Sequence, residues 1–453
     1  MRLCLINPGN PLVSLAKVKE SRWNKYRVWK PLSLLSLAGL TSSDWDIKVV
    51  DENCGVPDYA SLPRPDLVGI TAFSSQAPRA YQLAEEFRRR GIAVVMGGIH
   101  ATMCLDEAQE RVDAVVTGEA ENVWATVLED ARKGALKRVY QGTEAAMDKV
   151  PVARHDLLST GYRFGSIQTT RGCPLSCSFC SVPAFNGKTY RFRPVEQVVK
   201  EFQLIREKLI LITDDNLIGI HRDHFDRAKD LFKTMIRADL GKQWVGQVSI
   251  NVADDEEVLR LAKRSGCIGL FIGLESPTEE GLAEVNKKFN TRGGRNLKAS
   301  VQRIQRQGIA VAGSFIIGLD ADQKGIGRKV AAAAQHYGVD LLNVLFLTPL
   351  PGTRLWNKME TENRIALHNF PEDWKYFTLT YPVARYRNLS RAEIFAEVDS
   401  CNRDFYSSPR IFYRLGMNLW HSRNPFLLLV SNLSYRKNHR LDQKAYKVFS
   451  QAA

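Results

Sequence analysis

The sequence predicts an α/β fold built from parallel sheets. Two observations carry this prediction: apolar segments without polar alternation recur along the chain, and an amphipathic segment of helical period precedes most of them. In one such unit Ala80, Leu83 and Phe87 share a helical face, Gly91 ends the helix, and the apolar segment IAVVMGG follows. Strands that are apolar on both faces belong to sheets that helices cover on both sides.

Length and composition indicate a globular chain of two or three domains, with 453 residues of which 44% are apolar. The first residues, MRLCLINPGN, lack the pattern of a signal peptide, and no apolar run is long enough to span a membrane. A cytoplasmic location is therefore expected. Eight cysteines in such a chain do not form a disulfide framework, so a tight cysteine cluster points to metal or redox chemistry.

Five apolar segments define the first domain. They are LCLIN, IKVVDEN, LVGITAF, AVVMGG and AVVTGE, and their number suits a doubly wound, Rossmann-like domain over residues 1–140. The polar stretch that follows, beginning at RKGALKRVYQ, has little helical or strand period. It is interpreted as a linker, and residues 141–165 are assigned to it.

Residues 166–355 alternate strand and helix often enough for a full or partial (β/α) barrel. VLRLAKRSG leads into CIGLFIGLES, and Leu297, Val301 and Ile304 line a helix before IAVAGSFIIGL. The functional groups of such barrels lie at the carboxyl ends of the strands. Residues 356–453 show no repeat and are expected to form a mostly helical, basic region.

The loop RGCPLSCSFC, after the first predicted barrel strand, holds Cys173, Cys177 and Cys180 without a fourth cysteine nearby. The next cysteine, Cys267, begins an apolar strand and is explained by core packing. Structural zinc sites and most iron-sulfur clusters take four protein ligands, so three thiolates leave one metal position open for a small molecule. A chance spacing or a zinc knuckle is the alternative interpretation.

The spacing Cys-x3-Cys-x2-Cys resembles the radical S-adenosylmethionine (SAM) family, and the resemblance extends through RGCPLSCSFCSVPAFNGKTYRFRP and the strands beyond it. It implies that the three cysteines hold a four-iron, four-sulfur cluster and that SAM chelates the fourth iron. Reductive cleavage of SAM then yields a 5'-deoxyadenosyl radical, while the protein supplies position and a dry pocket. An external electron donor, such as a flavodoxin or a ferredoxin, is implied as well.

Polar residues at the predicted strand ends are the candidates for binding SAM, because several strands place such groups at one rim of the barrel. A solvated strand end is the alternative for any one of them. The candidates are Phe179, Asp214, Asp215, Gln247, Ser249 and Glu275. In the basic exit of the cysteine loop, Arg191 and Arg193 are expected to face the negative charge of the cluster or the substrate.

The first domain resembles the cobalamin-binding domain that precedes the barrel in one large class of radical SAM enzymes, through IKVVDEN, ITAFSSQAPRA, VVMGGIHAT and VVTGEAE. Loop glycines let the backbone approach a corrin ring, and hydroxyls can bond its tail. The candidate residues are Thr71, Ser74, Gly97, Gly98, His100, Gly118 and Glu119. The motif Asp-x-His-x-x-Gly does not occur, which implies cobalamin held without a histidine below the cobalt.

These resemblances imply a cobalamin-dependent radical SAM enzyme, a methyltransferase that moves methyl from methylcobalamin to an unactivated carbon of an apolar, lipid-like or secondary-metabolite substrate. A cyclase or rearrangement enzyme of the same class is an alternative. A methylthiotransferase would bind a second cluster through Cys4, Cys54 and Cys104, but these cysteines are interpreted as packed or loop residues. A non-catalytic iron-sulfur module that binds RNA is a further alternative, although the tail lacks clear stacking platforms.

The net charge of +14, from 63 basic and 49 acidic residues, is interpreted as a solvated basic surface, and no nucleic-acid partner is expected. Half of the excess lies in residues 381–453. One helical face there is predicted from the spacing of Ile411, Phe412, Leu415, Leu419 and Trp420. Either this face packs on the barrel, or it makes a peripheral membrane contact that helps deliver an apolar substrate.

Overall fold

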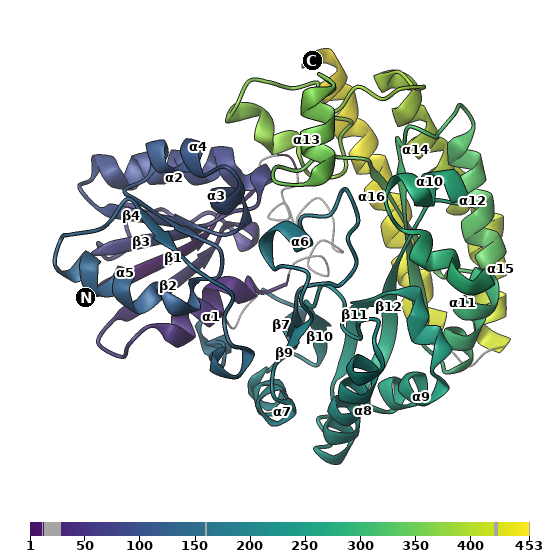
Figure 1. Ribbon diagram of the computed structural model, residues 1–453, viewed down its shortest axis with the longest axis horizontal. Helices are drawn as coiled ribbons and strands as arrows, with labels where there is room; N and C mark the ends of the chain where they lie inside the picture. Colours follow the sequence, from purple (N-terminus) through teal and green to yellow (C-terminus); the bar gives the residue numbers. More distant parts are fainter. Residues whose placement is uncertain (11, 13–28, 159–160, 421–424, 453) are drawn as a thin grey trace.

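The computed structural model describes residues 1–10, 12, 29–158, 161–420 and 425–452 (Figure 1). Its strands form two six-stranded sheets and one short antiparallel pair. Every neighbouring pair of strands in the two large sheets is parallel, so the predicted α/β class is confirmed.

The first sheet has the spatial order β2-β1-β3-β4-β5-β6. Its strands are β1 (Arg2–Asn7), β2 (Asp46–Asp51), β3 (Leu67–Thr71), β4 (Ala93–Gly97), β5 (Ala114–Thr117) and β6 (Val139–Gln141). The helices of this domain are α1 (Leu32–Leu40), α2 (Ala77–Arg89), α3 (Ile99–Met103), α4 (Leu105–Arg111) and α5 (Trp124–Arg132). Helices α1 and α5 share one apolar core while α2 packs in the other, so the predicted doubly wound arrangement is confirmed.

Strand β6 was not predicted. It lies in the polar stretch interpreted as a linker, where it pairs with β5 and extends the first sheet. Only Tyr140 of its three residues is buried, so the strand is too short to give either an apolar or an alternating pattern. Between β6 and the barrel, the described residues include two short 3-10 turns, η5 (Met147–Lys149) and η6 (His155–Leu157).

The second sheet follows chain order, β7-β10-β11-β12-β13-β14, and forms a partial barrel as predicted. Its strands are β7 (Phe164–Ile167), β10 (Leu209–Ile212), β11 (Gln243–Val248), β12 (Cys267–Glu275), β13 (Ala310–Ile317) and β14 (Leu341–Phe346). The helices are α6 (Val182–Phe185), α7 (Val195–Leu204), α8 (Arg222–Arg237), α9 (Glu256–Arg264), α10 (Glu279–Glu284), α11 (Leu297–Arg306) and α12 (Ile326–Tyr337). Figure 1 shows short α6 between this sheet and the first domain.

The C-terminal region is mostly helical, as predicted. It contains α13 (Arg354–Thr361), the 3-10 helix η9 (Glu372–Tyr376), α14 (Arg391–Phe405), α15 (Ser408–Trp420) and α16 (Pro425–Ala452). Helix α14 packs on β14 and α12, and α16 packs on α14, so these helices cover the β14 edge of the barrel. None of the described helices has the length and apolar content needed to cross a bilayer.

The predicted apolar face of α15 is divided in the structure. Ile411 is 2% exposed, whereas its neighbour Phe412 is 68% exposed. Leu415 is half-buried and packs against the core. The side chains of Leu419 and Trp420 lie outside the described residues. Part of the face therefore packs inward, while an exposed aromatic side chain remains beside it.

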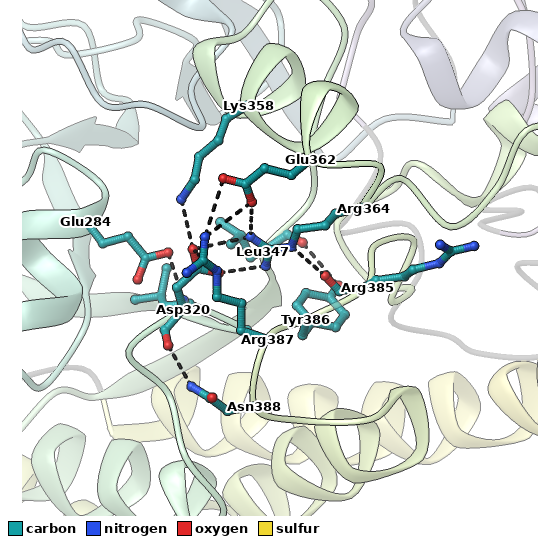
Figure 2. Close-up of polar contacts among 12 residues, drawn as sticks. Glu284, Asp320, Leu347, Lys358, Glu362, Arg364, Arg385, Tyr386, Arg387 and Asn388 are labelled. Carbon is teal, nitrogen blue, oxygen red and sulfur yellow. Dashed lines mark hydrogen bonds and ion pairs between the residues drawn. The ribbon is translucent and has the colours of Figure 1, made fainter.

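The segment between α13 and α14 is bound to the barrel at Asp320, which follows β13 (Figure 2). Its carboxylate accepts hydrogen bonds from Lys358 Nζ at 2.8 Å and Arg364 Nη2 at 2.6 Å, and Arg387 Nε lies 3.2 Å away. Burial raises the pKa of Asp320, but the hydrogen bonds from Arg364 and Lys358 outweigh it and lower the pKa. Arg364 and Arg387 thus hold this segment at the barrel rim, and Lys358 holds the end of α13 there.

The same segment also contacts the first domain. Trp374 in η9 donates its indole N–H to both carboxylate oxygens of Glu107 in α4, at 3.1 and 3.0 Å. Phe370 stacks on the Trp374 ring with a centroid distance of 3.9 Å. The segment therefore bridges the barrel and the first domain.

Candidate functional site

The carboxyl ends of the two sheets border one cavity of about 550 Å³. In the first domain the cavity lies outside the ends of β1 and β3, where the strand order reverses and ligands bind in sheets of this type. Across from these strands, α6 and the loop after β10 form its wall. Lining residues include Asn7, Thr71, Gly97, Gly98, Gly118, Ser181, Phe185, Asn186 and Asp215.

The cysteine loop is closed at its base by the antiparallel strands β8 (Thr170–Arg171) and β9 (Arg191–Phe192). Gly172 follows β8 with φ of 82°. A Cβ at this position would lie 2.2 Å from the carbonyl oxygen of Thr189, so only glycine allows the chain to turn here. The turn directs the chain straight into Cys173.

The three thiols of this loop are close enough to affect one another's ionisation. Burial raises the pKa of Cys173, Cys177 and Cys180, to about 12 for Cys180, and neighbouring thiolates of the set raise the pKa of Cys177 and Cys180 further. Among the described residues no three His, Cys, Asp or Glu side chains are grouped to hold one metal ion. A structural zinc site takes four protein ligands, whereas a cluster with one iron left open to a small molecule needs only these three.

Lys287 is a site residue that the sequence prediction missed. Its buried ammonium lies 3.4 Å from Glu275 Oε1, at the end of β12. Burial lowers the pKa of Lys287, but the charges of Glu275 and the three cysteines outweigh it and raise the pKa. The cation can therefore offset the negative charge of a cluster or of a ligand carboxylate. The only hint of Lys287 in the sequence was Glu275, because a carboxylate at the end of an apolar strand needs a partner when it is buried.

Glu275 occupies the predicted position at the barrel rim, with backbone φ of 65°. Burial raises the pKa of its carboxyl, and Lys287 opposes that shift. Gly273 makes room for the pair, because a Cβ there would lie 2.1 Å from Glu275 Oε1. A non-glycine residue in the left-handed region at a strand end is a strained conformation of the kind that functional sites retain.

Asn216 is the second site residue that was missed, although it directly follows the two predicted acids. Its Nδ2 lies 3.9 Å from Cys173 Sγ and donates to Ser249 Oγ at 3.1 Å. Asn216 and Ser249 are both buried. The structure therefore joins the predicted Ser249 to the cysteine loop through a side chain on the neighbouring strand end.

The two predicted acids after β10 point to different places. Asp215 lines the cavity and accepts a hydrogen bond from Asn186 Nδ2 at 3.0 Å, and burial raises its pKa. Asp214 is a correction: its carboxylate accepts hydrogen bonds from both the backbone N–H and the hydroxyl of Thr169, at 2.5 Å each. Asp214 is buried, so its oxygens tie the end of β10 to Thr169 just beyond β7, and it is not among the residues that line the cavity.

The remaining SAM candidates lie near the rim. Gln247 is exposed and donates to the carbonyl of Asp215 at 3.2 Å, and Phe179 is half-buried against the core. Arg191 and Arg193 do not face the thiols as expected. Arg193 pairs with buried Glu201 in α7 at 2.7 Å, and Arg191 pairs with Glu119.

Two glycines of the first domain are needed where the predicted corrin-binding loops approach each other. Gly98 has φ of 90°, and a Cβ there would lie 2.6 Å from Thr71 Oγ1. Gly118 has φ of 65°, and a Cβ there would lie 2.6 Å from the carbonyl of Gly142. Together with Gly97 they leave backbone as the surface of the cavity wall, which suits a broad, flat ligand such as a corrin.

Two predicted corrin contacts do not line the cavity. His100 is fully buried, with Nε2 2.9 Å from the hydroxyl of Tyr81 and 3.2 Å from Glu107 Oε1. These partners hold Nε2 inside the domain, while Nδ1 is buried and has no hydrogen-bond partner among the described residues. Ser74, at the start of the 3-10 turn η3 (Ser74–Gln76), is also buried. No histidine is among the described residues that line the cavity.

Glu119 lines the cavity as predicted, but its carboxylate is already engaged. It accepts hydrogen bonds from Arg171 Nη1 at 2.8 Å, from Arg191, and from the backbone N–H of Ala145 at 2.8 Å. Its part in the site is therefore to bind the barrel, and a direct bond to cobalamin is not supported.

The fold and this site define a class of proteins with a cobalamin-type domain before a partial barrel. Residues 167–324 match the radical SAM superfamily, and residues 25–128 match the B12 binding domain. The chain belongs to the radical SAM superfamily, in the group whose barrel follows a B12 binding domain. Its cofactors are a four-iron, four-sulfur cluster, SAM and cobalamin.

Several relatives are similar to this chain over most of its length. Bacteriochlorophyllide d C-12(1)-methyltransferase of Chlorobaculum tepidum is 29% identical over 402 residues, covering 85% of this chain and 84% of that protein. Hopanoid C-2 methylase of Rhodopseudomonas palustris is 25% identical over 347 residues, covering 74% and 65%. Anaerobic magnesium-protoporphyrin IX monomethyl ester cyclase of Rubrivivax gelatinosus is 26% identical over 423 residues, covering 83% and 74%.

A solved structure shares the whole architecture. The radical SAM methyltransferase TsrM of Kitasatospora setae, with cobalamin and an iron-sulfur cluster bound, has a TM-score of 0.68 with this chain. The likeness covers 99% of each chain at 15% identity, so it establishes the common fold.

Removal of one cluster cysteine is expected to abolish SAM cleavage. Anaerobically reconstituted protein should bind about four irons, and Cys173→Ala should lose them because two thiolates hold a cluster poorly. Iron analysis and chromatography of 5'-deoxyadenosine measure both effects. Cys267→Ala, which removes a buried thiol of β12, is the control and should keep its iron. About eight irons per chain, halved in Cys54→Ala, would instead indicate a second cluster.

Cobalamin is expected to bind without a protein imidazole below the cobalt. Paramagnetic resonance of the bound cobalt(II) form should therefore lack splitting from a histidine nitrogen. His100→Ala should retain the corrin but lose on the order of 1–3 kcal/mol of stability, because Tyr81 and Glu107 lose a buried partner. Imidazole splitting that disappears in His100→Ala would contradict this expectation, since it would require the ring to leave its pocket.

Proposed function

We propose that this radical SAM enzyme transfers a methyl group to an unactivated carbon of an apolar or lipid-like substrate. The observation that carries the proposal is a cavity that both the predicted corrin-binding loops and the end of the cysteine loop line. A methyl group held at one wall can reach a substrate carbon that is activated at the other. The names of the bacteriochlorophyllide and hopanoid relatives support methyl transfer to substrates with large apolar skeletons.

The proposed roles of the cofactors follow from the two halves of the cavity. When bound, the cluster and SAM would supply a carbon-centred radical, and cobalamin would supply the methyl group. Cys173, Cys177 and Cys180 would hold the cluster. The candidate SAM contacts are those that converge on the cysteine loop, namely Asp215, Asn216, Ser249, Glu275 and Lys287.

Apolar side chains give the cavity the water exclusion that radical chemistry requires. Leu37 and Leu40 of α1 line it from the first domain, and Val182 and Phe185 of α6 line it from the barrel. Excluding water prevents the radical from being quenched and strengthens electrostatic contacts within the cavity. The same walls favour an apolar substrate over a charged one.

A cyclase or rearrangement enzyme is the second candidate function, favoured by the cyclase relative. The methylthiotransferase alternative has less support. Cys4 is buried within β1, Cys104 is half-buried beside α4, and only Cys54 is exposed.

An acidic one-electron donor, such as a flavodoxin or a ferredoxin, is the proposed protein partner. The carbonyl of Ser176, within the cysteine loop, accepts hydrogen bonds from Asn286 and Arg354, so this part of the loop lies close to exposed side chains. Exposed Lys288 and Arg292 follow in the next segment. Positive charge near the cluster loop favours docking of an acidic protein.

Methyl transfer can be tested with SAM that carries a deuterated methyl group. Reduced flavodoxin, SAM and either bacteriochlorophyllide d or a hopanoid are supplied to the reconstituted enzyme. The label should appear intact in the product, with S-adenosylhomocysteine and 5'-deoxyadenosine formed in equal amounts, because one SAM gives the methyl group and another gives the radical. Product without label, accompanied by 5'-deoxyadenosine alone, would assign the chain to cyclisation or rearrangement.

A peripheral membrane contact is proposed for the C-terminal helices. Phe412 and Tyr413 of α15 are 68% and 71% exposed, and Phe426 of α16 is 74% exposed. Burying large apolar side chains contributes roughly 1.5–3 kcal/mol each. Nearby basic residues of α16, such as Lys437 and Arg440, are exposed and add attraction to anionic lipid.

Co-sedimentation with anionic vesicles should detect this contact. Wild-type protein is expected to pellet with the vesicles, whereas a Phe412→Glu, Phe426→Glu variant should stay in the supernatant while keeping its far-UV spectrum. Val56→Glu is the matched control, because Val56 is 62% exposed in the first domain. If wild-type protein does not bind the vesicles, the membrane contact is wrong and these helices only cover the barrel edge.

A further inference from the structure

Two arginines at the base of the cysteine loop converge on one carboxylate of the first domain. Arg171 and Arg191 are Cα partners in the β8–β9 pair, and both side chains reach Glu119 in the loop after β5. Arg171 Nη1 lies 2.8 Å from Glu119 Oε2, and Arg191 contacts both oxygens, with Nη1 3.1 Å from Oε2. The entry and the exit of the cysteine loop are thereby tied to the same group.

This group of arginines and glutamates is buried, and its positive and negative charges balance. The side chains of Arg171, Arg191 and Glu119 are 10%, 12% and 5% exposed, and Glu121 adds a second carboxylate 2.5 Å from Arg171. Burial raises the pKa of Glu119, but the hydrogen bond from Arg191 and the charge of Arg171 outweigh it and lower the pKa. Planar guanidinium groups that share charge-assisted hydrogen bonds fix orientation as well as distance.

Short stretches of chain connect this group of arginines and glutamates to both cofactor regions. Arg171 precedes Cys173 by two residues, and Glu119 directly follows Gly118 in the cavity wall. Arg191 also donates to the carbonyl of Asn186 at 3.2 Å, and the Asn186 side chain donates to Asp215 in the same cavity. A shift of these arginines relative to Glu119 must therefore move the cysteine loop relative to the corrin-binding loops.

We propose that Glu119, Arg171 and Arg191 are positioning residues that set the distance and orientation between the corrin and the iron-sulfur cluster. The inference rests on the proposed function, in which one substrate carbon must reach both cofactors. A buried ion pair is weak support for stability, since an apolar replacement is often neutral, but it does fix geometry. A misplacement of about 1 Å can lower a reaction rate on the order of 100-fold.

The test compares the magnetic interaction between two paramagnets, bound cobalt(II) corrin and the reduced cluster, in the holoenzyme without substrate. Wild-type protein is expected to give one defined dipolar interaction. Glu119→Gln keeps the size of the side chain and removes its charge, and it should lose that single interaction in favour of a broad, weaker distribution. SAM cleavage per cluster should persist, because it does not depend on where the corrin lies.

Glu52→Gln is the matched control. Glu52 is also buried, and its printed partners Gly9, Tyr59 and Arg79, the last at 2.7 Å, all belong to the first domain. Its loss should reduce stability as Glu119→Gln does, while the magnetic interaction stays that of the wild type. If Glu119→Gln lowers stability but leaves the interaction unchanged, the residues are structural only and the proposal is wrong.

A second variant covers the case in which Glu119→Gln does not fold or load its cofactors. Glu119→Asp preserves the charge and shortens the reach, so it should shift the interaction; an unshifted interaction overturns the proposal. Wild-type protein that binds the cluster but no corrin gives a different result. That outcome removes the proposed function itself, and the positioning role with it.

Discussion

Both large sheets present the carboxyl ends of their strands to one cavity, and the rest of the structure depends on that constraint. Polar loops converge at this end of a parallel sheet, so each cofactor region forms at strand ends. The backbone must turn sharply where the two ends meet. Gly98, Gly118 and Gly172 provide those turns, each with positive φ and each where a Cβ would meet another group.

Oppositely charged side chains near the carboxyl ends of the strands form groups that join distant parts of the chain. Lys287 and Glu275 lie beside the cysteines, Glu119 holds two arginines, and Asp320 holds three cations (Figure 2). Breaking such a buried pair is costly because the remaining charge has no partner. The apolar core on the α2 side is also continuous with the barrel core. Apolar packing therefore joins the two domains, and the ion pairs fix how their rims face each other.

Much of the architecture could be predicted, because repeated apolar strands and amphipathic helices carry the fold in local sequence. The helix with Ala80, Leu83 and Phe87 and the strand that begins at Cys267 occur as predicted, with these side chains buried. Strand β6 was missed because three residues carry no readable period. The cysteine spacing is equally local, which is why the cluster loop could be recognised from a few residues. Side-chain roles at the strand ends could be predicted only in part.

Those roles depend on partners that spacing does not reveal. Asp214 and Asp215 are identical neighbours, yet one holds the end of β7 and the other faces the cavity, because adjacent residues after a strand point to opposite sides. The basic excess of the C-terminal region shows the same limit. Arg414 is half-buried over the ring of Phe405 at 3.9 Å and donates to Asn432, and desolvation lowers its pKa to about 10. Part of the charge interpreted as solvated surface therefore joins α15 to α16, so net charge alone overstates the basic surface available to a partner.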